Sequence, residues 1–132
     1  MTLPDPRHLS DTPDVYAPDG SEIRLLQAVK GGSMVHCTLP PWAISKAVKH
    51  RTVEEMWYCI SGAGEVWRKL GAAERVVNFT PGVSLSIPLG AHFQFRNPGD
   101  EPLVLIIATT PPWPGKDEAI RVADYWPLDD GE

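Results

Sequence analysis

Three side chains that can bind a metal or move a proton lie in two short segments of this 132-residue chain. His50 and Glu55 belong to the first segment, HRTVEEMWYCISGAG (50–64), and His92 belongs to the second, GVSLSIPLGAHFQFRN (82–97). Neutral imidazole and carboxylate are common ligands of Zn, Mn, Fe and Ni, and two histidines with one carboxylate leave coordination positions open for a substrate. The alternative without a metal is that His50 and Glu55 hydrogen-bond each other.

Each segment has the pattern of a strand, a tight glycine turn and another strand. VSLSI (83–87) alternates apolar and polar residues, which is the period of a strand with one wet face. LVLIIATT (103–110) is continuously apolar, which predicts a strand covered on both faces. Fourteen prolines and eleven glycines leave little room for long helices. The sequence therefore predicts an all-β jelly-roll barrel of about nine strands, with a short helix or an extended tail at its C-terminal end (116–132).

Length and composition predict how the chain is organised. Residues 1–20 contain four prolines and no periodicity, which predicts an extended arm, and residues 21–132 have the size of a single domain. The net charge of −5 argues against binding to nucleic acid or to an anionic membrane. No run of about 18 apolar residues is present, so no bilayer span is expected. The N-terminus lacks signal-peptide features, and Cys37 and Cys59 lie in apolar runs typical of reduced core thiols, so we expect a cytoplasmic protein.

The first segment resembles one of the two sequence motifs of the cupin family. His50, Glu55 and Gly62 match the second half of that motif in type and spacing. Val48 stands where the family has its first histidine, which is a departure from the pattern. The resemblance extends over roughly residues 33–110 and implies a cupin-type barrel with a cavity inside it.

The second segment resembles the other cupin motif and allows two phasings. Gly82, Pro88, Gly90 and Asn97 fall in register, and the histidine position is then occupied by Phe93. In one phasing Phe93 and Phe95 face inward; in the other, His92, Gln94 and Arg96 line the cavity, as germin-type cupins allow. Outward phenylalanines would forgo roughly 1.5–3 kcal/mol of burial each unless a second subunit covered them. Other strands with apolar outer residues favour such cover, so we expect His92 to face inward.

The resemblance and the residue types together give the candidate site residues. The candidate metal ligands are His50, Glu55 and His92. The candidate catalytic residues are His50, His92 and Arg96, the last as an anchor for a substrate carboxylate or phosphate. The candidate substrate-binding residues are Trp57, Gln94 and His36. For most of these residues a purely structural role stays open as the alternative: packing in the core or at an interface, a surface ion pair, or hydrogen bonding to neighbouring polar groups.

Two classes of function follow from this pattern. The first is an enzyme acting on a small organic or sugar-like molecule, with metal-assisted isomerase, lyase, cyclase or oxygen-dependent chemistry. The second is a binding or sensor protein whose cavity holds a small molecule without a metal or turnover. A metal-free enzyme with a histidine as general base stands between them. We also expect a homodimer, because Met56, Tyr58 and Ile60 would face outward if Glu55 faces inward.

Overall fold

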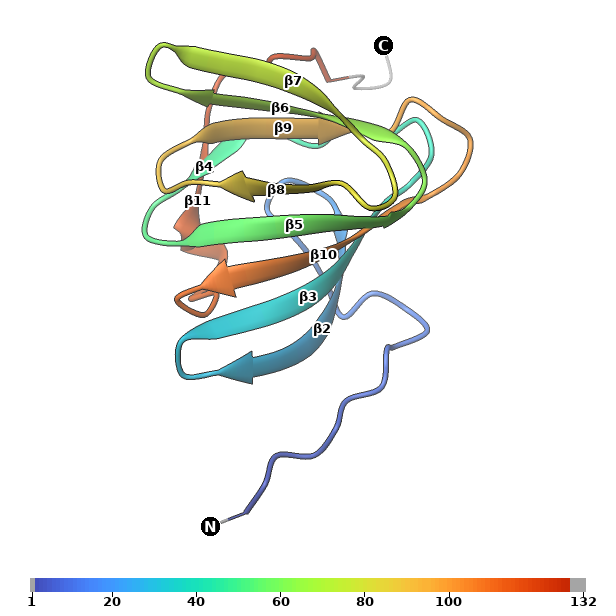
Figure 1. The fold of residues 1–132 in the computed structure, drawn as a ribbon, viewed down its shortest axis with the longest axis vertical. Helices are drawn as coiled ribbons and strands as arrows, with labels where there is room; N and C mark the ends of the chain where they lie inside the picture. The colour runs from blue at the N-terminus through green and yellow to red at the C-terminus, as the bar shows by residue number, and fades with distance from the viewer. Residues whose placement is uncertain (1, 129–132) are drawn as a thin grey trace.

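The computed structural model describes residues 2–128, which form two antiparallel sheets (Figure 1). Sheet A runs in the order β1 (Val15–Tyr16), β2 (Glu22–Val29), β3 (Gly32–Leu39), β10 (Leu103–Thr110), β5 (Glu54–Ser61) and β8 (Ser84–Ile87). Sheet B runs in the order β11 (Ala119–Arg121), β4 (Val48–His50), β9 (His92–Arg96), β6 (Gly64–Leu70) and β7 (Ala73–Phe79). Within the described residues the sheets do not close into a barrel, and the arrangement is consistent with a jelly roll. The all-β, cupin-like prediction is confirmed.

The nine predicted strands are all present, and two short strands join them. β1 forms within the segment expected to be an arm, and β11 forms within the segment expected to be helical or extended. The only helical turn among residues 2–128 is the 3-10 turn η1 (Lys116–Glu118). Of the predicted tail, residues 129–132 lie outside the described residues.

The core lies between the two sheets and follows the two-residue period of the strands. In β5, Glu55, Trp57 and Cys59 are buried, while the residues between them are exposed. β10 alternates in the same way, with Leu105 fully buried and Ile106 half-buried. The expectation that both faces of β10 are covered is therefore too strong, because the outer face of sheet A is only partly shielded.

β9 takes the phasing opposite to the expected one. Phe93 and Phe95 point into the core, where their rings lie 5.4 Å and 5.0 Å from the ring of Trp57. Since side chains alternate along a strand, His92, Gln94 and Arg96 lie on the outer side of sheet B. The predicted inward orientation of these three residues is wrong, because the phenylalanine rings find more apolar contact in the core than outside it.

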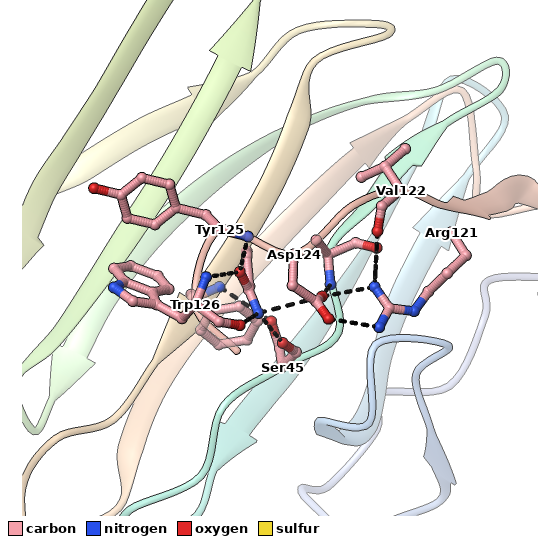
Figure 2. Close-up of polar contacts among 9 residues, drawn as sticks. Ser45, Arg121, Val122, Asp124, Tyr125 and Trp126 are labelled. Atoms are coloured by element: carbon pink, nitrogen blue, oxygen red, sulfur yellow. Dashed lines mark hydrogen bonds and ion pairs between the residues drawn. The ribbon is translucent and has the colours of Figure 1, made fainter. Parts of the chain in front are cut away.

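The outer side of β9 is covered by the chain that follows β11. Gln94 is fully buried there: its Nε2 donates to the carbonyl oxygens of Ser45 and Trp126, both at 2.9 Å. Its Oε1 accepts from the backbone N–H groups of Tyr125 and Trp126 at 2.9 Å and 2.8 Å. Figure 2 shows this network, with Asp124 bridging it to Arg121. The C-terminal segment thus satisfies an amide that would otherwise be buried without partners.

The N-terminal segment is attached to β2 by a hydrogen bond. Asp14 accepts a hydrogen bond from the backbone N–H of Leu25 at 2.8 Å, which fastens the N-terminal segment to β2.

Met56, Tyr58 and Ile60 are exposed on the outer face of sheet A, as expected. The homodimer and the boundary between residues 20 and 21 stay predictions. Within residues 2–128 no helix combines the length and apolar character that a membrane crossing requires.

Candidate functional site

A cavity of about 710 Å³ opens at one end of the space between the sheets. Its walls come from β2, β3, β5 and β10 of sheet A, from β4 and β9 of sheet B, from the N-terminal segment, and from the loop that follows β10. Most lining side chains are apolar. Three polar side chains reach it from the strands that form its inner part: His50, Glu55 and Thr109.

Glu55 lies on β5 directly opposite Thr109 of β10 and is only 7% exposed. The indole N–H of Trp57 donates to Oε1 at 3.0 Å, and the hydroxyl of Thr109 donates to Oε2 at 2.9 Å. Burial raises the pKa of Glu55 from 4.5 to about 7, although these two hydrogen bonds act in the opposite direction. The carboxyl group therefore exchanges its proton near neutral pH.

His50 ends β4 and is 5% exposed. Its ring packs against two aromatic rings in edge-to-face orientation. The centroid of the imidazole lies 5.0 Å from that of Phe93 and 5.4 Å from that of Trp113. Its Nδ1 is buried and has no hydrogen-bond partner among the described residues. Burial lowers the pKa of His50 from 6.5 to about 4, against the opposing charge of Glu118, so the imidazole is neutral at physiological pH.

Glu118 holds the backbone beside His50 in place. Its carboxylate accepts hydrogen bonds from the hydroxyl of Thr52 at 2.6 Å and from the backbone N–H of Val53 at 2.9 Å. The next residue, Ala119, pairs with His50 across the β11–β4 ladder. Glu118 could not be predicted from the sequence, because its partners lie more than sixty residues earlier in the chain and no local pattern points to them.

The residues do not fit the expected three-ligand metal site. His92 lies on the outer side of sheet B, and Phe93 takes the position opposite His50. Both carboxylate oxygens of Glu55 already accept hydrogen bonds. Within residues 2–128, no group of three or more histidine, cysteine, aspartate or glutamate side chains is arranged to hold a metal ion. The structure therefore places His50 and Glu55 on the lining of one cavity, and His92 outside it.

The remaining candidates are divided between the cavity and the surface. Trp57 lines the cavity, whereas Gln94 binds the C-terminal segment. Arg96 pairs with Glu65 at 2.7 Å and lies outside the cavity lining. His36 also lies outside the lining, on the side of β3 that faces away from the core, opposite Arg24 and Ile106 on the neighbouring strands. The expected convergence of Gln94, Arg96 and His36 on the cavity is thus not formed.

Two cavity residues carry more weight than the sequence indicated. Thr109 binds the carboxyl group of Glu55, yet it reads as the end of an apolar strand. Trp113, which follows two prolines, lines the cavity beside His50. The aromatic residue between prolines was a detectable signal for a loop that closes one end of the fold, but its contact with His50 was not detectable.

Several known proteins are similar to this chain in sequence. The xanthan biosynthesis protein XanB of Xanthomonas campestris pv. campestris is 34% identical over 89 residues, which cover 67% of this chain and 18% of that protein. The alginate biosynthesis protein AlgA of Pseudomonas putida is 30% identical over 116 residues, covering 86% of this chain and 22% of that protein. The chain therefore spans less than a quarter of the length of these relatives.

Solved structures share the fold at lower identity. The capsular polysaccharide assembling protein CapF of Staphylococcus aureus superimposes with a TM-score of 0.67 at 15% identity, over 79% of this chain and 32% of that one. The oxalate decarboxylase of Lactobacillus farciminis gives a TM-score of 0.66 at 22% identity, over 77% and 31% of the two chains. The sequence profile of the cupin domain matches residues 35–109, more than half of the chain. The chain belongs to the cupin family.

Proposed function

We propose that this cupin binds a small organic molecule in the cavity and catalyses a proton transfer of the isomerase type without a metal. Glu55 acts as the acid–base group, and His50 acts as a neutral hydrogen-bonding partner for the substrate. The observation that carries the proposal is the placement of a buried carboxyl group and a buried, unpartnered imidazole on the lining of one cavity.

The protonation of Glu55 suits this role. A general base works best when its pKa lies near the working pH, and the pKa of Glu55 is about 7. Each carboxylate oxygen has two lone-pair directions, so the hydrogen bonds from Trp57 and Thr109 leave room for a substrate proton. The two donors also fix the carboxyl group in one orientation, so less conformational entropy is lost when it is aligned with a bound substrate.

The proposed reaction needs no further reagent. The ionised carboxylate takes a proton from a carbon next to a carbonyl group, and the electron pair of that C–H bond moves to the carbonyl oxygen. The resulting enolate accepts a hydrogen bond from the imidazole N–H of His50, which stays neutral because its pKa is about 4. Glu55 then returns the proton to the enolate oxygen, which converts the substrate to its enol tautomer and leaves the enzyme unchanged.

The similarity to proteins named for xanthan and alginate biosynthesis supports, at a coarser level, a role connected with carbohydrate metabolism. Because the chain spans less than a quarter of those proteins, the similarity does not specify the ligand of this cavity. The second candidate function is a non-catalytic binding or sensor protein that uses the same cavity. It is favoured by the hydrophobic residue at position 48, where the family motif has a histidine. The two candidates differ in one measurable property, which is turnover of a C–H proton.

Proton exchange in deuterated water tests the proposal. Two carbonyl probes, 2-tetralone and dihydroxyacetone, are incubated with the protein, and loss of the signal of the proton next to the carbonyl is followed by NMR. We expect exchange above the buffer rate for at least one probe, with a pH profile that inflects near 7. Glu55→Gln should reduce the enzymatic rate about 100-fold or more. The exposed neighbour Glu54→Gln is the matched control and should keep the rate.

Exchange at the buffer rate for both probes would favour the binding or sensor protein instead. An unchanged enzymatic rate in Glu55→Gln would show that another group transfers the proton.

A further inference from the structure

We infer that the ligand of this cavity is a mainly apolar, ring-containing molecule with a single carbonyl or hydroxyl group, and not a polyhydroxylated sugar. The inference rests on the proposed use of the cavity as a ligand site and adds the class of ligand to it. It follows from what the cavity wall offers to a bound molecule.

The inner wall is built from aliphatic and aromatic side chains of both sheets. Ile23, Val35 and Ile107 contribute to it from sheet A, and Val48 and Phe93 contribute from sheet B. Such a wall stabilises apolar surface that is removed from water, at about 25 cal/mol per Å². These side chains offer no hydrogen-bond donor or acceptor to a hydroxyl group of the ligand.

Most polar groups of the wall are already paired within the protein. Both oxygens of Glu55 accept hydrogen bonds. The hydroxyl of Ser33 accepts from the backbone N–H of Trp113 at 3.0 Å, and the hydroxyl of Ser21 donates to Asp19 at 2.7 Å. Among the side chains that line the cavity, Nδ1 of His50 is the one fully buried nitrogen or oxygen atom without a hydrogen-bond partner within residues 2–128.

This inventory decides between the two classes of ligand. A hydroxyl group that is buried without a partner loses its hydrogen bonds to water and gains none, and a sugar carries several hydroxyl groups around its ring. A molecule with one polar end can place that end at His50 and Glu55 and leave the rest against the apolar wall. The positively charged side chains of the lining, Arg7 and Lys116, are exposed, so the interior offers no counter-charge to a phosphate.

The aromatic side chains favour a ring in the bound molecule. Phe93 and Trp113 flank His50 at 5.0 Å and 5.4 Å, both in edge-to-face orientation. Phe93 also meets Trp57 edge to face at 5.4 Å. Edge and face surfaces of this kind contact a further aromatic or alicyclic ring favourably.

Binding measurements on the full chain test the ligand class. Isothermal titration with 2-tetralone, D-mannose and mannose 1-phosphate compares a ring ketone with a sugar and a sugar phosphate. We expect 2-tetralone to bind and to show a negative heat-capacity change, because it buries apolar surface. Neither sugar compound should bind with comparable affinity.

A matched pair of tryptophan variants locates the binding. Trp113→Ala removes an aromatic side chain that lines the cavity and should weaken 2-tetralone about tenfold or more, which corresponds to about 1.4 kcal/mol. Trp42→Ala removes an exposed tryptophan that also follows prolines but does not line the cavity, and should leave the affinity unchanged.

Three results would overturn the inference: no binding of 2-tetralone, tighter binding of either sugar compound, or equal affinity in the Trp113→Ala variant and the natural protein. The outcome is separable from that of the proposed function. Binding of 2-tetralone without proton exchange would support the ligand class and refute the catalysis. Binding and exchange of dihydroxyacetone together with a preference for the sugars would do the opposite.

Discussion

Replacing Glu55 by glutamine should change how the stability of the protein depends on pH. The pKa of this carboxyl group is about 7 in the folded chain and close to 4.5 when the chain is unfolded. Below pH 4.5 both states bind the proton, and above about pH 7 neither does. Between these values only the folded state binds it, so the free energy of unfolding falls as the pH rises.

The size of this effect follows from the width of the interval. A shift of about 2.5 pKa units corresponds to about 3 kcal/mol, the free energy needed to keep the ionised carboxylate in its buried position. Glutamine has nearly the same shape, keeps a carbonyl oxygen for the indole N–H of Trp57, and cannot ionise. The glutamine variant should therefore gain about 3 kcal/mol relative to the natural protein as the pH rises from about 4.5 to about 7, and it should keep this gain at higher pH.

Urea unfolding of both proteins across this pH range measures the difference directly. His50 contributes an opposite slope, because its lowered pKa makes stability rise between about pH 4 and pH 6.5. That slope is present in both proteins and cancels when their free energies of unfolding are subtracted. Glu54→Gln, at an exposed position of the same strand, shows what the loss of a surface carboxylate does by itself. A difference that stays constant with pH would refute the claim that Glu55 is held in a desolvated environment.

Two further variants test the parts of the fold that position the site. Gln94→Leu should release the C-terminal segment, because the backbone N–H groups of Tyr125 and Trp126 lose their acceptor. The release is measured as faster hydrogen exchange at these two amides. The control is Gln27→Leu, which loses one exposed hydrogen bond. Glu118→Ala should lower the free energy of unfolding by about 3 kcal/mol in urea, because it leaves the buried N–H of Val53 and the part-buried N–H and hydroxyl of Thr52 without their acceptor. An unchanged midpoint would contradict this role.

The position of Glu55 could be predicted from the sequence because its strand has a clear period. Trp57 and Cys59 follow it at two-residue intervals, and the residues between them are exposed in the structure. The turn that follows also requires glycine, since a Cβ atom at Gly62 would collide with the carbonyl oxygen of Pro102. Local pattern and tertiary packing agree at this strand, so the prediction holds.

The phase of β9 could not be predicted in the same way. All three of its central residues, Phe93, Gln94 and Phe95, are buried, so alternation does not separate the inner face from the outer one. The outer face is covered by a segment about thirty residues later in the chain, whose backbone satisfies Gln94. The sequence of β9 and its neighbours contains no pattern that predicts the packing of this later segment on the strand. The same reason explains why Glu118 was missed.

The phase of this one strand determines the chemistry that the cavity can support. With His92 turned away, the ring of Phe93 lies against His50, and the surroundings of the imidazole become apolar. A less polar environment disfavours charge, which lowers the pKa of a histidine and raises that of a carboxyl group. The pKa values of His50 and Glu55 follow this rule and give protonation states that suit proton transfer: a neutral imidazole and a carboxyl group that titrates near pH 7. Phe93, at the position where the cupin motif has a histidine, thus gives His50 an apolar neighbour in place of an imidazole, and this favours the acid–base chemistry proposed above.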